Sequence, residues 1–211
     1  MNTASTYEKQ HQEILVPCAA ELQNLLESYL AGMPRVDRIS VRAKSPASFL
    51  KKAQKIEDGS VVYPDPLGQI QDQIGARVIV FFTSDVEPTS ERIQKYLTYI
   101  EKTTKEPKTE AEFGYFGRHY ILSLPPDCVP ANKQIQQAPP VFELQIRTLF
   151  QHAWSEAQHD IGYKPVQPLN ADQKRRFAFT AAQAWGADRI FEELFDEVGS
   201  LSSTPRADPP I

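Results

Sequence analysis

The sequence predicts an α+β domain, in which a mixed β-sheet is flanked by helices and extended by a helix at each end. Segments with strand alternation and segments with helical spacing follow one another unevenly along the chain. The length of 211 residues suits one large domain with helical extensions. Hydrophobic residues make up 41% of the chain, which is enough for an ordinary core.

The N-terminal part begins with a predicted helix over 6–31. Pro17 should kink or split this helix, because proline removes a backbone donor and crowds the preceding turn. A strand is expected at 36–44, then a short basic helix that begins within 45–48. Gly, Pro and Asp are frequent over 58–68, so a loop is expected there.

The strongest strand signal is I-G-A-R-V-I-V-F-F at 74–82. Residues 86–100 read as a helix and the start of a strand. The polar stretch 103–112 should be mobile, and the tail after Ser200 should be disordered. The remaining predicted elements are strands near 116–124 and 140–147 and helices over 148–160 and 171–197.

Composition narrows the class of protein. The net charge of −4 argues against bulk nucleic-acid binding, although a local basic patch remains open. Cys18 and Cys128 are the two cysteines, far apart and without C-x-x-C spacing, so we expect a reducing, cytoplasmic setting. No stretch is apolar enough to span a bilayer and the N-terminus lacks a signal-peptide pattern, so no membrane partner is expected.

A basic cluster, R-A-K-S at 42–45, could bind phosphate. Alternation places Arg42 and Lys44 on one strand face. The backbone N–H groups at the start of the next helix favour anions, and Ser48, Lys51 and Lys52 follow just beyond the R-A-K-S cluster. These groups together suit a triphosphate, while a solvated basic edge is the plainer alternative.

The segment D-Q-I-G-A-R at 72–77 combines a carboxylate with a buried-strand arginine. The Arg77 guanidinium needs a matched charge there, and it could stack on a base or clamp a phosphate. Asp72 is a suitable Mg²⁺ ligand. Strict alternation would separate the two side chains, so they share a site only if Asp72 lies on the turn before the strand. A structural Asp–Arg ion pair is the alternative.

The strand V-F-E-L-Q-I-R-T at 141–148 alternates cleanly, and its polar face carries Glu143, Gln145 and Arg147. Glu143 could hold Mg²⁺ together with Asp72, or accept a proton from an attacking hydroxyl. An edge strand with one wet face would show the same pattern.

Two further groups are candidates for an acceptor site. Tyr115 and His119 fall on one strand face, where a ring could stack on a purine and an imidazole could bind phosphate or ribose. Ordinary half-buried strand residues are the alternative. His152, Glu156 and His159 share a helix face without the H-E-x-x-H pattern, so a supporting role is expected rather than metal binding.

In this order the motifs resemble the synthetase domain of the RelA/SpoT family, which makes the alarmones (p)ppGpp. The resemblance covers roughly 35–165, and the size is similar to that of a small alarmone synthetase or a related toxic synthetase. Its motifs are R-A-K-S at 42–45, D-Q-I-G-A-R-V-I-V at 72–80, G-Y-x-x-x-H-Y at 114–120 and F-E-L-Q-I-R-T-L-F-Q-H-A-W-S-E-A-Q-H-D-I-G-Y-K at 142–164.

The resemblance implies a nucleotidyltransferase-like sheet and a transfer of pyrophosphate from ATP to the 3′-hydroxyl of GDP or GTP, with Mg²⁺ as cofactor. The implied ATP-binding residues are Arg42, Lys44, Ser48, Lys52 and Arg77. The implied metal and catalytic residues are Asp72 and Glu143. The implied acceptor-binding residues are Tyr115, His119, Gln145 and His152. The expected parts are an N-terminal helical extension (1–34), the synthetase domain (35–165), a C-terminal helix (166–199) and a disordered tail (200–211).

Other acceptors stay open, because Ala111 stands where family members often carry a lysine and Glu110 and Glu112 flank it. Adenosine nucleotides or the 3′ CCA end of tRNA are alternatives, as is a catalytically silent nucleotide-sensing module. An antitoxin partner and a homo-oligomer are further possibilities. A tRNA would need a basic surface, for which the candidates are Lys102, Lys105, Lys108, Lys174, Arg175 and Arg176.

Overall fold

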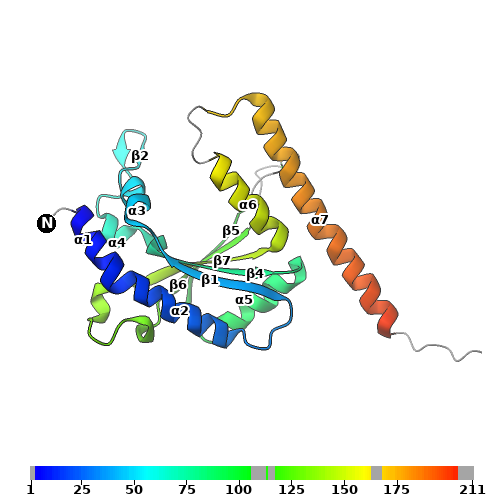
Figure 1. Ribbon diagram of the computed structural model, residues 1–211, viewed down its shortest axis with the longest axis horizontal. Helices are drawn as coiled ribbons and strands as arrows, with labels where there is room; N and C mark the ends of the chain where they lie inside the picture. Colours follow the sequence, from blue (N-terminus) through cyan, green and yellow to red (C-terminus); the bar gives the residue numbers. More distant parts are fainter. Residues whose placement is uncertain (1–2, 106–112, 114–116, 163–167, 204–211) are drawn as a thin grey trace, which may run out of the picture.

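A five-stranded mixed sheet forms the centre of the protein and carries helices on both faces, as the sequence predicts (Figure 1). The computed structural model describes residues 3–105, 113, 117–162 and 168–203. The strand order is β1-β4-β7-β6-β5, with β4 and β7 parallel and the other pairs antiparallel. The strands are β1 (Val36–Ala43), β4 (Ile74–Val80), β5 (Tyr99–Lys105), β6 (Gly117–Ser123) and β7 (Val141–Thr148).

The two faces of the sheet differ in chemistry. Aliphatic and aromatic side chains of β4, β6 and β7 point to one face and are fully buried there, for example Val78, Tyr120 and Leu144. Because side chains alternate along a strand, the opposite face carries the polar side chains, including Arg77 and Gln145. The central strands therefore divide a core from a polar surface.

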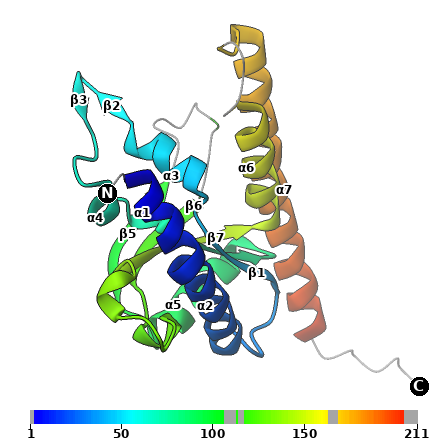
Figure 2. The same ribbon diagram turned by 60° about the vertical axis from the view of Figure 1, so that its left-hand side comes forward.

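Helices cover the two faces unequally. α2 and α5 pack on the core face, and α6 lies over the polar face with α7 beside it (Figure 2). The N-terminal and central helices are α1 (Thr3–Gln10), α2 (Val16–Tyr29), α3 (Pro46–Ala53), α4 (Pro66–Gln69) and α5 (Val86–Gln94). The C-terminal helices are α6 (Leu149–Gly162) and α7 (Ala171–Ser203). Short 3₁₀ turns are η2 (Gln71–Gln73), η3 (Thr83–Asp85), η4 (Pro126–Cys128) and η5 (Ile135–Gln137).

Pro17 divides the N-terminal helix through a π-helical turn, η1 (His11–Leu15), rather than through a sharp break. The N–H of Val16 donates to the carbonyl of His11, five residues back, which widens the turn. Pro17 lacks an N–H and its ring would crowd the preceding turn of a regular α-helix, so the wider turn accommodates it.

The loop expected at 58–68 contains more structure than the sequence indicated. A small hairpin, β2 (Ile56–Glu57) and β3 (Ser60–Val61), precedes α4. Its turn is Asp58-Gly59, and both residues have positive φ (48° and 76°), a pairing typical of a two-residue hairpin. Both strands are exposed, so they lack the buried alternation that marks a strand in a sequence.

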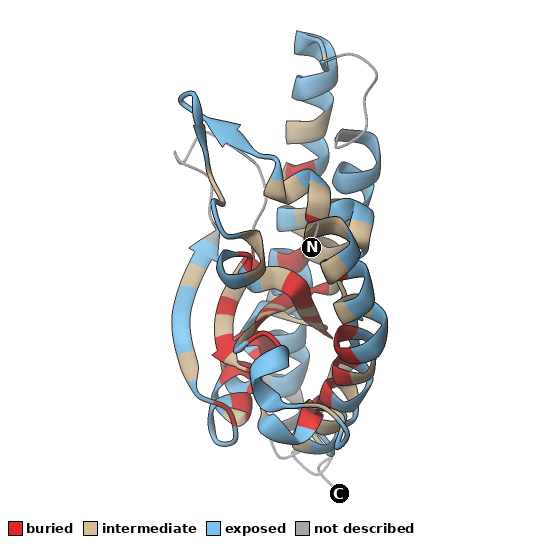
Figure 3. Ribbon diagram, turned by 90° about the vertical axis from the view of Figure 1, so that its left-hand side faces the viewer, coloured by how far each residue is buried: buried red, intermediate tan, exposed pale blue. Residues whose placement is uncertain are grey.

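The aromatic residues of the long C-terminal helix lie largely at the surface rather than in a core. α7 has 33 residues and stands along one side of the molecule against α6 (Figure 1). Phe179 is 63% exposed and Ile190 is 58% exposed, whereas the buried residues gather around the sheet (Figure 3). A homo-oligomer stays a prediction. No helix among the described residues has the length and apolarity needed to cross a membrane.

Candidate active site

A cavity of about 900 Å³ lies on the polar side of the sheet, between α3 and α6. It is lined from β1, α3, β4, β7 and α6. The lining includes all the predicted ATP and metal residues, namely Arg42, Lys44, Ser48, Lys52, Asp72, Arg77 and Glu143, together with Gln145 from the predicted acceptor residues. Residues that are more than 100 positions apart in the sequence therefore face one space.

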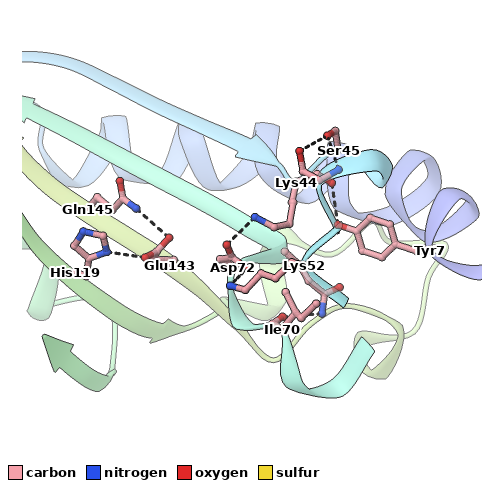
Figure 4. A network of polar contacts seen from close by, with 11 residues as sticks. Tyr7, Lys44, Ser45, Lys52, Ile70, Asp72, His119, Glu143 and Gln145 are labelled. Carbon is pink, nitrogen blue, oxygen red and sulfur yellow. Dashed lines mark hydrogen bonds and ion pairs between the residues drawn. The ribbon is translucent and has the colours of Figure 1, made fainter. Parts of the chain in front are cut away.

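Asp72 lies on the 3₁₀ turn directly before β4, which is the placement that lets it share a site with Arg77. Its carboxylate accepts from Lys44 Nζ at 2.7 Å and from Lys52 Nζ at 2.9 Å (Figure 4). Burial raises the pKa of Asp72, but the hydrogen bonds and charges of the two lysines outweigh it and hold the pKa below its usual value. The alternative of an Asp72–Arg77 ion pair is wrong, because Arg77 pairs elsewhere.

Buried anchors hold this turn and the end of β1 in place. The Gln73 side chain is 1% exposed and donates to the carbonyls of Leu67 and Ile70. The Lys44 N–H donates to the Gln73 carbonyl at 2.8 Å. Tyr7 Oη donates to the Lys44 carbonyl at 2.9 Å, and its ring stacks on Phe49 of α3 with centroids 3.6 Å apart. The N-terminal helix thus fixes the backbone that carries Lys44.

The start of α3 matches the predicted phosphate-binding helix end. Ser45 caps the helix, since its Oγ accepts from the Ser48 N–H at 3.3 Å, and Pro46 occupies the first turn, where its missing N–H is not needed. Lys51 and Lys52 lie in the last turn, and Lys51 and Lys55 also line the cavity. The basic side of α3 therefore faces the cavity rather than bulk solvent alone.

Glu143 is the second carboxylate of the cavity. Its Oε1 is 2.7 Å from His119 Nδ1, and its Oε2 accepts from Gln145 Nε2 at 3.0 Å (Figure 4). Burial raises the pKa of Glu143 and so does the charge of Asp72, but the hydrogen bonds from His119 and Gln145 with the charge of His119 outweigh them. The pKa therefore lies below its usual value, and the side chain is a carboxylate at neutral pH.

Gly75 leaves the floor of the cavity open, a feature that we did not single out in the sequence. In the sheet register it lies between Arg42 of β1 and Glu143 of β7. A Cβ atom at this position would meet nothing within 4 Å. A glycine inside a strand is the available signal, because it often marks the close approach of a ligand.

Arg42 and Arg77, the two arginines expected to bind ATP, lie near each other on this face. Arg77 pairs with Ser40 across β1 and β4, two positions from the Arg42–Gly75 pair, so the arginines are diagonal neighbours. Arg77 Nη1 donates to Glu156 Oε1 of α6 at 2.5 Å, whereas the Arg42 side chain is exposed. Glu156 thus binds Arg77, a residue expected to bind ATP. Sequence spacing alone did not reveal this contact.

The acceptor residues are placed less completely. His119 lies on β6 beside Glu143, in register with Gln145. Tyr115 is outside the described residues. His152 of α6 is half-buried, and desolvation lowers the pKa of its imidazole. His159, to which the sequence assigned no contact, lines the cavity opposite α3. Arg118 points to the other face and pairs with Glu87 of α5.

The carboxylates provide hard oxygen donors of the kind that Mg²⁺ prefers. Among the described residues, no group of three or more His, Cys, Asp or Glu side chains forms a complete metal site. Asp72 and Glu143 face the same cavity, and the charge of one affects the titration of the other. This donor set fits an ion that takes its remaining ligands from phosphate and water.

Comparisons with known proteins agree with this geometry. The GTP pyrophosphokinase YjbM of Bacillus subtilis (strain 168) is 24% identical over 202 residues, which is 90% of this chain and 91% of the relative. A GTP pyrophosphokinase family protein from Streptococcus pneumoniae superposes with a TM-score of 0.73 at 21% identity, covering 99% of this chain and 100% of that one.

Small alarmone synthetase 1 from Bacillus subtilis has the same fold, with a TM-score of 0.69, 21% identity and coverage of 87% and 95%. The model of the region found in RelA/SpoT proteins matches residues 41–167, which contain both carboxylates and the basic cluster. The chain therefore belongs to the RelA/SpoT family.

Proposed function

We propose that this enzyme, a transferase, moves the β,γ-pyrophosphate of ATP to the 3′-hydroxyl of GDP or GTP, giving (p)ppGpp and AMP. The observation that carries the proposal is the convergence of Asp72, Glu143 and the basic cluster on one cavity. Two structures of one relative support the substrates: small alarmone synthetase 1 of Bacillus subtilis has structures bound to its product pppGpp and to AMPCPP. That enzyme shares the fold of this chain at 20% identity.

The ATP side of the proposal rests on the lysines and the helix start. Lys44 and Lys52 are the donors nearest Asp72, and ammonium groups bind phosphate oxygens through charge-assisted hydrogen bonds. Ser48 lies in the first turn of α3, where backbone dipoles favour anions. Arg42 and Arg77 hold the adenine between them in this proposal, with Glu156 orienting the Arg77 guanidinium.

Glu143 accepts the proton in the transfer step. The 3′-hydroxyl of the acceptor attacks the β-phosphorus of ATP, the bond from that phosphorus to the α-phosphate oxygen breaks, and AMP leaves. The hydroxyl proton passes to the Glu143 carboxylate, whose lowered pKa keeps it ready to accept at neutral pH. His119 and Gln145 hold that carboxylate and border the acceptor.

Mg²⁺ would be held by Asp72 and Glu143 together with phosphate oxygens, and when bound it supplies positive charge that offsets the charge on the transferring group. Both lysines pair with the Asp72 carboxylate in the present arrangement. Phosphate binding would give the lysines a new anionic partner and make the Asp72 oxygens available.

A transfer assay tests the proposal. The purified protein is incubated with Mg²⁺, ATP labelled in the γ-phosphate and one acceptor at a time, and the labelled products are separated. Label on GDP or GTP is the expected result, and it should be lost in Glu143→Gln. If only an adenosine nucleotide or only tRNA becomes labelled, that molecule is the acceptor in place of GDP or GTP. No transfer to any acceptor would contradict the proposal.

A further inference from the structure

Arg147 is a buried cation on the polar face of β7 whose position the proposed chemistry does not use directly. Its side chain is 4% exposed, at the end of the strand covered by α6. A guanidinium at this depth is costly unless hydrogen bonds compensate it. Its Nη2 donates to Gln145 Oε1 at 2.5 Å, and its Nη1 donates to Ser155 Oγ of α6 at 3.0 Å.

This contact determines which way the Gln145 amide points. A guanidinium carries donors and no acceptor, so Gln145 must turn its oxygen toward Arg147. The amide nitrogen then faces the other way and donates to Glu143 Oε2 at 3.0 Å. If the amide were reversed, its oxygen would face a carboxylate and its nitrogen would face a guanidinium, and both contacts would be repulsive.

We propose that Arg147 is a positioning residue that acts through the Gln145 amide to fix the Glu143 carboxylate for accepting the acceptor proton. The inference rests on the proposed function, because it assigns Arg147 to the same proton transfer. α6 contributes through Ser155, which holds the second arm of the guanidinium. A chain of hydrogen bonds thus runs from α6 to the reacting carboxylate, and His119 holds its other oxygen.

The substitution Arg147→Met removes the donors and keeps an unbranched side chain. Free rotation of the Gln145 amide should weaken its bond to Glu143, so kcat should fall by about 10-fold to 100-fold, the usual effect of losing a partner that orients a ligand. The KM for ATP should change little, because Arg147 does not line the cavity. Arg147→Lys should recover part of the loss, since an ammonium can still donate to Gln145 but lacks the planar fork that also reaches Ser155.

A double-mutant cycle separates positioning from simple stabilisation. In a Gln145→Leu background, Arg147→Met should cause no further fall in kcat, because the amide through which Arg147 acts is absent. Effects of the two substitutions on kcat that simply add would contradict an action through Gln145.

Arg35→Met is the matched control, because Arg35 also makes a hydrogen-bonded ion pair, with Asp85, but lies away from the cavity. It should lower the unfolding temperature without lowering kcat. The side-chain amide signals of Gln145 in NMR spectra of the free protein give a readout without turnover, and in Arg147→Met they should shift and exchange faster with water, because the bond to the guanidinium is lost. A folded Arg147→Met protein with an unchanged kcat and unchanged amide signals would overturn the inference.

The two proposals fail in different ways. If the unmodified protein transfers pyrophosphate to no acceptor while the Gln145 amide signals still move in Arg147→Met, the positioning stands and the proposed function fails. If transfer is normal and neither kcat nor the amide signals change in Arg147→Met, the proposed function stands and Arg147 has only a structural role.

Discussion

Replacing Asp72 by asparagine separates a catalytic role for this side chain from a structural one. Asparagine has nearly the same shape and removes only the charge. In the free protein Asp72 accepts from Lys44 at 2.7 Å and from Lys52 at 2.9 Å, so a purely structural role would make the substitution costly for stability alone. A role in holding Mg²⁺ and the transferring phosphates would make it costly for turnover.

The structure predicts a small loss of stability and a large loss of turnover. The three side chains are 19%, 22% and 33% exposed, so each ion pair should contribute between the surface and buried extremes, about 0.5–1 kcal/mol. The free energy of unfolding should therefore fall by roughly 1–2 kcal/mol, or about 2–8 °C in Tm. Loss of an electrostatic group aimed at the reaction costs ~10²-fold or more in kcat. The KM for ATP should not rise, because the lysines are released for phosphate.

Thermal unfolding and steady-state kinetics measured on the same preparation give both quantities. The control is Asp85→Asn, which makes the same change at a buried ion pair with Arg35, outside the cavity. It should lose stability and keep kcat. Because the pKa of Asp72 is lowered by folding, its stabilisation is present above the unfolded pKa and fades as pH falls. An Asp72→Asn enzyme with normal kcat would refute the catalytic role.

Three further outcomes are expected. Gly75→Val should fill the open floor of the cavity and raise the KM for ATP at least ~10-fold with the fold intact, as checked by circular dichroism; an unchanged KM would contradict this role. Tyr7→Phe should cost about 1 kcal/mol of unfolding free energy by removing the bond to the Lys44 carbonyl, and an unchanged Tm would argue against it. Burial raises the pKa of Asp188 to about 6, so the folded protein holds this proton more tightly than the unfolded chain and the free energy of unfolding should fall as pH rises through 6. Asp188→Asn should abolish that pH dependence. A slope that persists in the variant would assign the dependence to another group.

The strands and the carboxylates were predictable because their signals are local. Alternation alone separates Glu143 and Gln145 from the buried residues between them, and the structure confirms that division. The position of Asp72 needed one extra condition, a turn before the strand, and that condition holds. The core strands were predictable for the same reason, because burial on one face imposes a period of two on the sequence.

The features missed in the sequence depend on long-range contacts. No local pattern shows that Glu156 of α6 captures Arg77 of β4, because the two residues are 79 positions apart. The apolar spacing of α7 indicates a helix with an apolar face but does not say what covers that face. The exposed hairpin turn at Asp58-Gly59 carried a signal in its dipeptide, which the surrounding Gly- and Pro-rich composition obscured.

The bond that breaks in ATP tests the central claim most directly. Phosphorus NMR of a reaction with GDP, ATP and Mg²⁺ follows both nucleotides at once. Attack at the β-phosphorus predicts that AMP and a guanosine with diphosphates at both the 3′ and 5′ positions appear in equal amounts, with neither formed by Glu143→Gln. Formation of ADP with a monophosphorylated acceptor, or of ADP and free phosphate, would contradict pyrophosphate transfer at this cavity.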